Sequence, residues 1–287
     1  MKVWINGKLV DKDQANVSVF DHGLLYGDGV FEGIRAYGGK VFQGRAHVDR
    51  LFESAGAIRL EIPAGREQIL EAIRKTMEAN GAKDAYIRLV VTRGAGTLGL
   101  EPNKCSGGTM FIIVDQVALY PKEMYDNGMA VIIAKTRRTS ATMVPPSVKS
   151  LNYLNNILAK VEAVDAGAPE ALMLNAEGEL AEATGDNVFI VRGGTVITPP
   201  AAAGILMGIT RKVVLDLCGE AGIPVKEQPV TVEQLYSADE CFLTGTAAEV
   251  IAVTKVDGHV IGDGRPGPIT RHLLAAFREL IRSGQFD

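Results

Sequence analysis

Lys149 is the residue best placed for chemistry, because it is the only charged side chain among residues 139–159. Two prolines precede it, and apolar residues at helical spacing follow it: Leu151, Leu154, Leu158 and Val161. This spacing predicts a half-buried helix with Lys149 at or just before its first turn. A helix N-terminus and apolar surroundings both favour the neutral amine, which is the form that condenses with carbonyl groups. A solvated surface lysine is the alternative for this segment alone.

Two other segments have the features of anion-binding turns. Residues 208–211, "GITR", begin a predicted helix whose first backbone N–H groups and Thr210 hydroxyl could hold a phosphate. Residues 244–249, "TGTAAE", have small side chains that let backbone N–H groups approach an anion. Ordinary helix capping and a plain turn are the alternatives. Arg50, on a predicted helix, is either a surface residue or a two-point phosphate ligand.

Glu182 lies among small residues in "AEATGDNVF", and its carboxylate is either a surface charge or an acceptor for a cationic ring nitrogen. Residues 94–99, "GAGTLG", match the pattern GxGxxG, but "LEPNKCSGG" follows where a dinucleotide site needs a helix. We therefore expect no dinucleotide there. The scattered histidines and the three separated cysteines predict neither a metal site nor a disulfide framework.

The first group of elements that must position these residues is a sheet with two helices. Residues 2–10 and 31–43 predict hairpins, with tight turns at Asn6-Gly7 and Gly38-Gly39. Apolar periodicity predicts helices at residues 45–58 and 65–82. Near-continuous apolar runs then predict central strands covered on both faces, at residues 84–93 and 109–117.

The second group begins at residue 129, after a stretch without clean periodicity at residues 117–125. Short strands are predicted in clusters, with helices at residues 208–222 and 267–284 between or after them. Such clustering is typical of an α+β fold. We therefore expect a small N-terminal α/β domain (1–116), an interdomain loop (117–125) and a large C-terminal domain (126–287).

Composition excludes several classes of protein. The 287 residues are 47% hydrophobic and 22% charged, which is typical of a globular enzyme, and the formal net charge is −4. A mildly acidic, mixed surface is not expected to bind nucleic acid or membranes. Unpaired cysteines and the lack of an apolar leader favour a cytoplasmic location.

Six motifs together resemble one family. They are "VSVFDHGLLYGDGVFEGIRAY", "DAYIRLVVTRG", "VKSLNYLNNILAK", "AEATGDNVF", "GITR" and "FLTGTAAEV". Their order and spacing are similar to those of the branched-chain amino acid aminotransferases, which are fold type IV pyridoxal phosphate enzymes of the class IV aminotransferase family. The resemblance extends from Lys2 to about Arg282. It implies two α/β domains with the active site between them, and at least a homodimer.

The resemblance also implies roles for individual residues. Lys149 would form the Schiff base with pyridoxal 5'-phosphate and move protons, Tyr153 would hydrogen-bond the phenolic oxygen, and Glu182 would hold the pyridine nitrogen protonated. Leu206 would pack on the ring, and the phosphate binders would be Arg50, Ile209, Thr210 and Thr246. Thr246 and Ala247, with Tyr86, would receive the substrate carboxylate, and Arg88 the γ-carboxylate of glutamate. The side-chain pocket would include Phe31, Gly33 and Tyr120, with Tyr26 and Leu100 from the neighbouring subunit.

The implied reaction transfers the amino group of L-leucine, L-isoleucine or L-valine to 2-oxoglutarate. D-amino acid or (R)-amine transaminases and aminodeoxychorismate lyases share the fold, and the motifs "YIR" and "VFEGIRAY" favour the branched-chain enzymes over them. A non-catalytic pyridoxal phosphate-binding protein is the alternative outside enzymes. The joint presence of Lys149, Tyr153 and Glu182 disfavours it.

Overall fold

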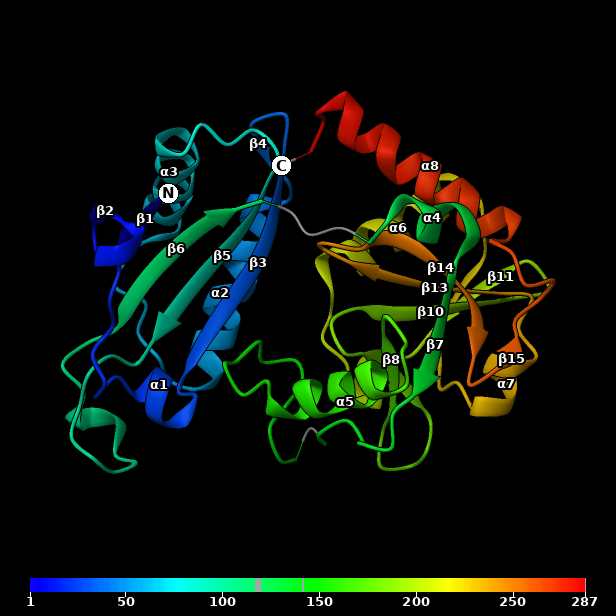
Figure 1. Cartoon of the computed structure of the whole chain (residues 1–287), viewed down its shortest axis with the longest axis horizontal. Helices are drawn as coiled ribbons and strands as arrows, with labels where there is room; N and C mark the ends of the chain where they lie inside the picture. Colours follow the sequence, from blue (N-terminus) through cyan, green and yellow to red (C-terminus); the bar gives the residue numbers. More distant parts are fainter. Residues whose placement is uncertain (117–119, 141, 287) are drawn as a thin grey trace. The chain divides into compact units, whose positions relative to one another are not determined.

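The structure is a computed structural model that describes residues 1–116, 120–140 and 142–286, and it divides into two compact units (Figure 1). Among the described residues, the first unit takes residues 1–116, 148–152 and 284–286, and the second takes the others.

The first unit is a six-stranded sheet in the order β2-β1-β6-β5-β3-β4, with every neighbouring pair antiparallel. Its strands are β1 (Lys2–Ile5), β2 (Lys8–Asp11), β3 (Gly29–Tyr37), β4 (Lys40–Val41), β5 (Ala85–Thr92) and β6 (Thr109–Asp115). Its helices are α1 (His22–Tyr26), α2 (Gly44–Ala57) and α3 (Arg66–Ala79), with short 3₁₀ turns at Lys12–Gln14 and Pro102–Lys104. Both predicted hairpins are confirmed, and Asn6 to Gly7 and Gly38 to Gly39 all have positive φ.

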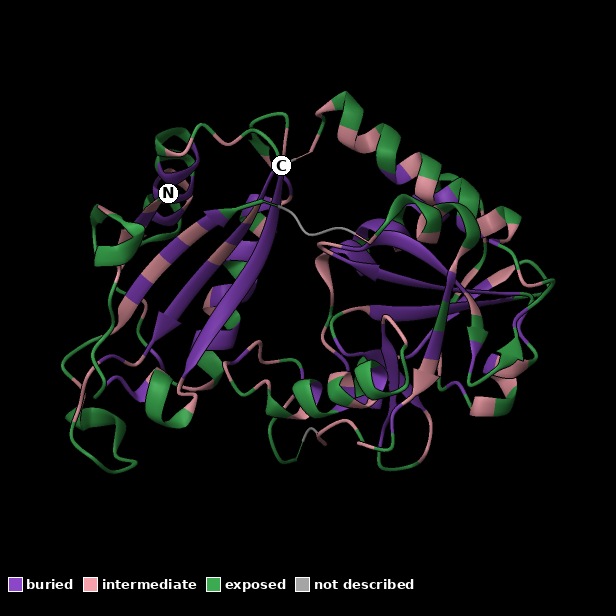
Figure 2. Ribbon diagram, in the orientation of Figure 1, coloured by how far each residue is buried: buried purple, intermediate pink, exposed green. Residues whose placement is uncertain are grey.

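Helices α2 and α3 cover one face of this sheet. Ile34, Ile87 and Ile112 from β3, β5 and β6 are fully buried there against Leu51 and Ile73. The other face is less completely covered, as Figure 2 shows for β6, where buried and half-buried residues alternate. The prediction that β6 is covered on both faces is therefore wrong, because only its alternate side chains meet the helices.

The second unit is a mixed nine-stranded sheet with the path β12-β11-β10-β13-β14-β7-β8-β9 and β15 beside β14. Its strands are β7 (Met129–Ile133), β8 (Ala171–Leu174), β9 (Leu180–Ala183), β10 (Asn187–Arg192), β11 (Thr195–Thr198), β12 (Val225–Glu227), β13 (Glu240–Gly245), β14 (Glu249–Val256) and β15 (His259–Val260). Its helices are α4 (Lys122–Asn127), α5 (Leu154–Asp165), α6 (Ile209–Glu220), α7 (Val232–Tyr236) and α8 (Pro268–Ser283), with a 3₁₀ turn at Ala201–Ala203. The clustered strands and intervening helices match the predicted α+β class.

The predicted interdomain loop falls partly outside the described residues, since residues 117–119 are not described. Residues 122–125 are helical, because they belong to α4. Residues 148–152, which include Lys149, group with the first unit although the sequence placed them in the C-terminal domain. The functional division into two domains stays a prediction.

Candidate active site

Lys149 lies in an extended segment beside β3 and not at a helix start. Its carbonyl oxygen accepts the Phe31 N–H at 3.0 Å, and its own N–H donates to Ser54 Oγ at 3.1 Å. Helix α5 begins only at Leu154, with Tyr153 as its N-cap residue. The predicted position of Lys149 at or just before the first turn is therefore wrong.

The Lys149 amine contacts an aromatic ring. Its Nζ atom lies 4.6 Å from the centre of the Phe31 ring. Phe31 is buried, with 5% of its surface exposed. The structure thus brings together the predicted catalytic lysine and one predicted substrate-pocket residue, and β3 pairing fixes both backbones.

Arg50 projects from α2 into a buried cluster with Glu32 and His47. Its Nε and Nη2 atoms donate to the two Glu32 carboxylate oxygens, each at 2.8 Å, and His47 Nδ1 lies 2.7 Å from Glu32 Oε2. Burial alone would raise the pKa of Glu32, but the Arg50 charge, aided by His47, lowers it to about 2. Burial lowers the pKa of His47, and the nearby Arg50 and Lys149 charges add to this against the opposing Glu32 carboxylate. The cluster therefore holds an ionised carboxylate in a dry position.

The less covered face of the first sheet carries Phe31, Gly33, Tyr86 and Arg88. Gly33 pairs with Arg88 across β3 and β5, and the guanidinium carbon of Arg88 lies 4.5 Å from the Phe31 ring centre. Arg88 Nη2 donates to Tyr86 Oη at 3.1 Å. A Cβ atom at Gly33 would stand 2.1 Å from Tyr86 Oη, so a larger residue at this position would displace the tyrosine side chain. These four predicted pocket residues are neighbours.

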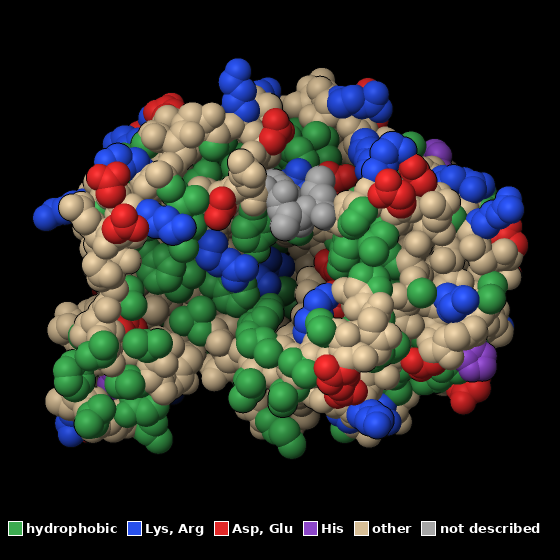
Figure 3. All heavy atoms as spheres, viewed as in Figure 1, with side chains coloured by type: hydrophobic (Ala, Val, Ile, Leu, Met, Phe, Trp, Pro, Cys, Tyr) green, Lys and Arg blue, Asp and Glu red, His purple; other side chains and the backbone are tan. Residues whose placement is uncertain are grey.

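Tyr26 and Leu100 lie in an exposed apolar patch formed by α1 and the segment after β5. Tyr26 Oη accepts the Gly99 N–H at 3.1 Å, and Leu100 is 81% exposed. Phe20, Leu24 and Leu98 are also more than half exposed. Figure 3 shows hydrophobic side chains gathered at the surface over α1, at the lower left.

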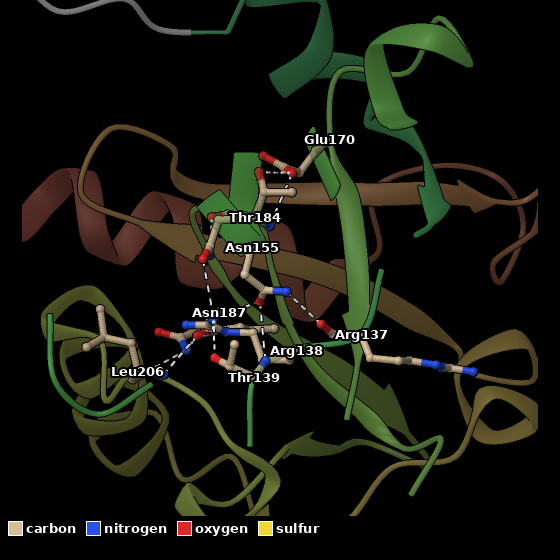
Figure 4. Close-up of polar contacts among 10 residues, drawn as sticks. Arg137, Arg138, Thr139, Asn155, Glu170, Thr184, Asn187 and Leu206 are labelled. Carbon is tan, nitrogen blue, oxygen red and sulfur yellow. Dashed lines mark hydrogen bonds and ion pairs between the residues drawn. The ribbon is translucent and has the colours of Figure 1, made fainter. Parts of the chain in front are cut away.

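Glu182 is buried on β9 and contacts Arg138, Asn187 and Leu206, which are labelled in Figure 4. Oε1 accepts a hydrogen bond from Arg138 Nε at 2.7 Å, and Oε2 accepts the Leu206 N–H at 2.9 Å. Asn187 Nδ2 lies 3.4 Å from Oε2 and also donates to the Leu206 carbonyl at 2.8 Å. The reading of Glu182 as a surface charge is excluded. Leu206, predicted to pack on a ring, is thereby tied to the same carboxylate.

Two turns of the second unit offer backbone N–H groups. Helix α6 begins after Gly208 with no side-chain cap, so Ile209 and Thr210 stand in a first turn whose N–H groups lack helical partners. Thr246 and Ala247 form the turn between β13 and β14. Both turns approach residues 186–187. A Cβ atom at Gly208 would stand 2.1 Å from Asn187 Oδ1, and one at Gly245 would stand 1.7 Å from Asp186 Oδ1. Only glycine permits these close approaches.

Tyr120 carries a phenol that stays protonated near neutral pH. Burial raises the pKa of Tyr120, and the Asp186 and Glu170 carboxylates raise it further. A neutral hydroxyl can donate a hydrogen bond, which suits a residue of a substrate pocket.

A family model described as "Amino-transferase class IV" matches residues 29–256. The chain belongs to the class IV aminotransferase family. The matched residues include β3, β14 and every helix and strand between them. The predicted family and the predicted enzyme class, an aminotransferase, are confirmed.

Relatives of this aminotransferase family match almost the whole chain. A protein of Methanocaldococcus jannaschii is 49% identical over 280 residues, covering 98% of this chain and 96% of its own length. The branched-chain-amino-acid aminotransferase of Pseudomonas aeruginosa is 40% identical over 287 residues, covering 97% and 92%. The crystal structure of the Escherichia coli branched-chain amino acid aminotransferase is 35% identical and superposes with a TM-score of 0.95 over 100% of this chain and 96% of that chain. The predicted fold is confirmed.

One solved structure of this aminotransferase family indicates a ligand. The branched-chain amino acid aminotransferase of Thermobaculum terrenum, in its PLP-form, is 33% identical, with a TM-score of 0.88 over 98% of this chain and 94% of that chain. PLP is pyridoxal 5'-phosphate, and this form is the holo-form of that protein.

Sequence reasoning missed several residues of these clusters. The sequence predicts no site role for Glu32, although Glu32 stands in one of the six motifs, and none for His47, Arg138 or Asn187. Their signal in the sequence is weak, because Arg138 is 44 positions from Glu182.

Within the described ranges, no helix is long and apolar enough to cross a bilayer.

Proposed function

We propose that this chain transfers the amino group of L-leucine, L-isoleucine or L-valine to 2-oxoglutarate, reversibly and in two half-reactions, with pyridoxal 5'-phosphate as cofactor. The observation that carries the proposal is the match of the whole chain, at 35% identity and a TM-score of 0.95, to a branched-chain amino acid aminotransferase of known structure. Similarity over the full length makes a change of reaction class between the two proteins unexpected.

The residues of the second unit fit this cofactor. A phosphate suits the uncapped start of α6 at Ile209 and Thr210 and the turn at Thr246, and the buried Glu182 carboxylate suits a protonated ring nitrogen. The hydroxyl of Thr244, in the strand before that turn, is buried and has no partner among the described residues. When bound, pyridoxal phosphate acts as an electron sink for the α-carbon of an amino acid.

The roles proposed for individual side chains follow from their chemistry. Lys149 would hold pyridoxal phosphate through its amine and, when free, would move the proton between the substrate α-carbon and the cofactor. Arg50 adds a positive charge for the phosphate, Tyr153 a hydroxyl for the phenolic oxygen, and Leu206 an apolar contact with the ring.

The substrate pocket that we propose combines apolar surface with one cation. Phe31 and Gly33 provide a site for a branched apolar side chain, and Arg88 meets the γ-carboxylate of glutamate. Tyr86 and the turn at Thr246 and Ala247 receive the α-carboxylate, and Tyr120 completes the pocket. One pocket can then take both kinds of substrate in alternate half-reactions.

We also infer a homodimer, for which α5 provides support. The larger apolar side chains of this helix are all at least 48% exposed, whereas the small Ala159 and Ala163 are fully buried. The exposed residues are Leu154, Ile157, Leu158, Val161 and Val164. A helix whose large apolar side chains face water is typical of an interface. A second copy would cover this stripe and the patch around Tyr26 and Leu100, and would bring those two residues to its neighbour's pocket.

A cytoplasmic location completes the proposal. Cys105, Cys218 and Cys241 are free, as expected in a reducing compartment.

A half-reaction panel tests this function. The purified protein is expected to be yellow, and L-glutamate, L-leucine, L-isoleucine and L-valine should each bleach its visible band. D-alanine and an (R)-amine should leave it unchanged. Bleaching by D-alanine or the amine alone would favour the alternative transaminases of this fold. A stable yellow colour with every compound would indicate a non-catalytic binding protein.

A further inference from the structure

We propose that Arg138 is a positioning residue for Glu182, holding its carboxylate ionised and in one orientation toward the pyridoxal phosphate ring. This inference rests on the proposed function. Arg138 and Glu182 form a nearly dry pair, with only 8% and 6% of their side-chain surfaces exposed. Since Oε2 is occupied by the Leu206 N–H, contacts on both oxygens prevent the carboxylate from rotating.

Arg138 is itself fixed from several directions. Its backbone N–H donates to the Leu174 carbonyl at 2.8 Å, which anchors it beside β8. Its Nη1 atom lies 3.2 Å from Thr139 Oγ1, 3.2 Å from Asn155 Oδ1 and 3.3 Å from Asn156 Oδ1. The planar guanidinium thus offers Nε to Glu182 and Nη1 to three other oxygens, a geometry that a lysine cannot reproduce.

The contacts continue beyond Arg138 to a second buried carboxylate (Figure 4). Asn156 Nδ2 donates to the Thr184 carbonyl at 2.9 Å, and the Thr184 N–H donates to Glu170 Oε1 at 3.2 Å. Glu170 is 3% exposed and contacts Lys160 Nζ at 3.2 Å. Arg138 therefore connects Glu182 to the first turn of α5, so that the helix and the carboxylate keep a fixed relation.

The physical reason for the pairing is desolvation. A buried carboxylate without a counter-charge tends to take up a proton and become neutral. A neutral acid cannot stabilise a ring nitrogen in its cationic form. We infer that Arg138 opposes this protonation, because its positive charge compensates the Glu182 carboxylate in the cofactor-free protein.

The adjacent arginine offers a matched control. Arg137 is exposed, and Figure 4 shows its side chain pointing away from Asn187 and Leu206. Only its backbone carbonyl takes part in the network, accepting from Asn155 Nδ2 at 2.8 Å. R137Q and R138Q remove the same charge from neighbouring positions, and only the second removes a contact to Glu182.

The experiment measures the dissociation constant of pyridoxal 5'-phosphate for R138Q, E182Q, the double variant and R137Q. R138Q should bind the cofactor about tenfold more weakly, as expected from losing one hydrogen bond to a charged group. R137Q should match the wild type. Because Arg138 acts through Glu182, the double variant should bind no more weakly than E182Q alone.

Equal binding by R138Q and R137Q would overturn the inference, and so would effects of R138Q and E182Q that simply add. If R138Q does not fold, R138K takes its place in the same cycle, and a loss of affinity that disappears in the E182Q background is expected. A wild-type protein that binds pyridoxal phosphate but fails to react with amino acids would contradict the proposed function and leave this cycle measurable.

Discussion

Arg50 and Glu32 form a two-point ion pair in the first unit, with both nitrogen-to-oxygen distances at 2.8 Å. Glu32 is fully buried, and His47 occupies the remaining side of its carboxylate. A guanidinium proposed to meet a phosphate is thus oriented by a neighbouring carboxylate, since two hydrogen bonds fix its plane.

Removing this carboxylate should destabilise the protein. Glu32→Gln leaves Arg50 buried without its charge partner, and we expect a loss of about 3 kcal/mol in the free energy of unfolding. Urea denaturation measures it. Glu71→Gln, which removes an exposed partner of Arg74, is the control and should leave the midpoint unchanged. Equal midpoints for both variants would contradict the expected role of burial.

The same cluster should make stability depend on pH. The pKa of Glu32 is lowered from 4.5 to about 2, so the unfolded chain binds more protons and the stabilisation is lost as the pH falls through this range. The pKa of His47 is lowered from 6.5, so its contribution is also lost as the pH falls, beginning near 6.5. The gap in thermal midpoint between wild type and Glu32→Gln should therefore narrow below pH 4.5. A difference in thermal midpoint that stays constant as the pH falls, until the protein unfolds in acid, would contradict the lowered pKa of Glu32.

Arg88 should be needed for the reaction of L-glutamate and much less for that of L-leucine. Arg88→Gln removes the cation that meets the γ-carboxylate, so kcat/KM for L-glutamate should fall about tenfold or more. The value for L-leucine should change by less than about threefold, because that side chain makes no ionic contact. Steady-state kinetics with both amino acids measure the ratio, and the exposed Arg45→Gln serves as control. Equal losses for both amino acids would show that Arg88 does not select between them.

The exposed apolar residues of α5, from Leu154 to Val164, should form the dimer interface. Leu158→Glu places a charge at its centre and should convert the dimer to monomers, because burying an unpaired carboxylate is costly. Light scattering after size-exclusion chromatography measures the mass. Ala79→Glu introduces the same group at an exposed position of α3 and should leave the mass unchanged. A dimeric Leu158→Glu protein would place the interface elsewhere.

Local signals in the sequence predicted much of the fold. Asn-Gly and Gly-Gly pairs predict the two hairpins because such turns depend on only a few residues. Asn80 and Gly81, which follow the last residue of α3, predict the end of this helix. The chain-wide motifs predicted the family correctly.

Long-range contacts account for the errors. Leu151 continues the helical spacing of α5, yet residues 149–151 pair with β3, which is more than a hundred positions away in sequence. The predicted buried face of α5 is also wrong, because Ala159 and Ala163 pack inward and the large apolar residues of this helix face outward. The setting of Glu182 depends on Arg138 and Leu206, and neither has a local signal.

The roles of the individual site residues stay predictions, and Lys149 is central to them. The most direct test is the single-turnover rate of bleaching by L-glutamate in Lys149→Ala, with the exposed Lys122→Ala as control. The account predicts a rate lower by about a thousandfold or more for Lys149→Ala and an unchanged rate for Lys122→Ala. A Lys149→Ala protein that reacts at the wild-type rate would contradict it.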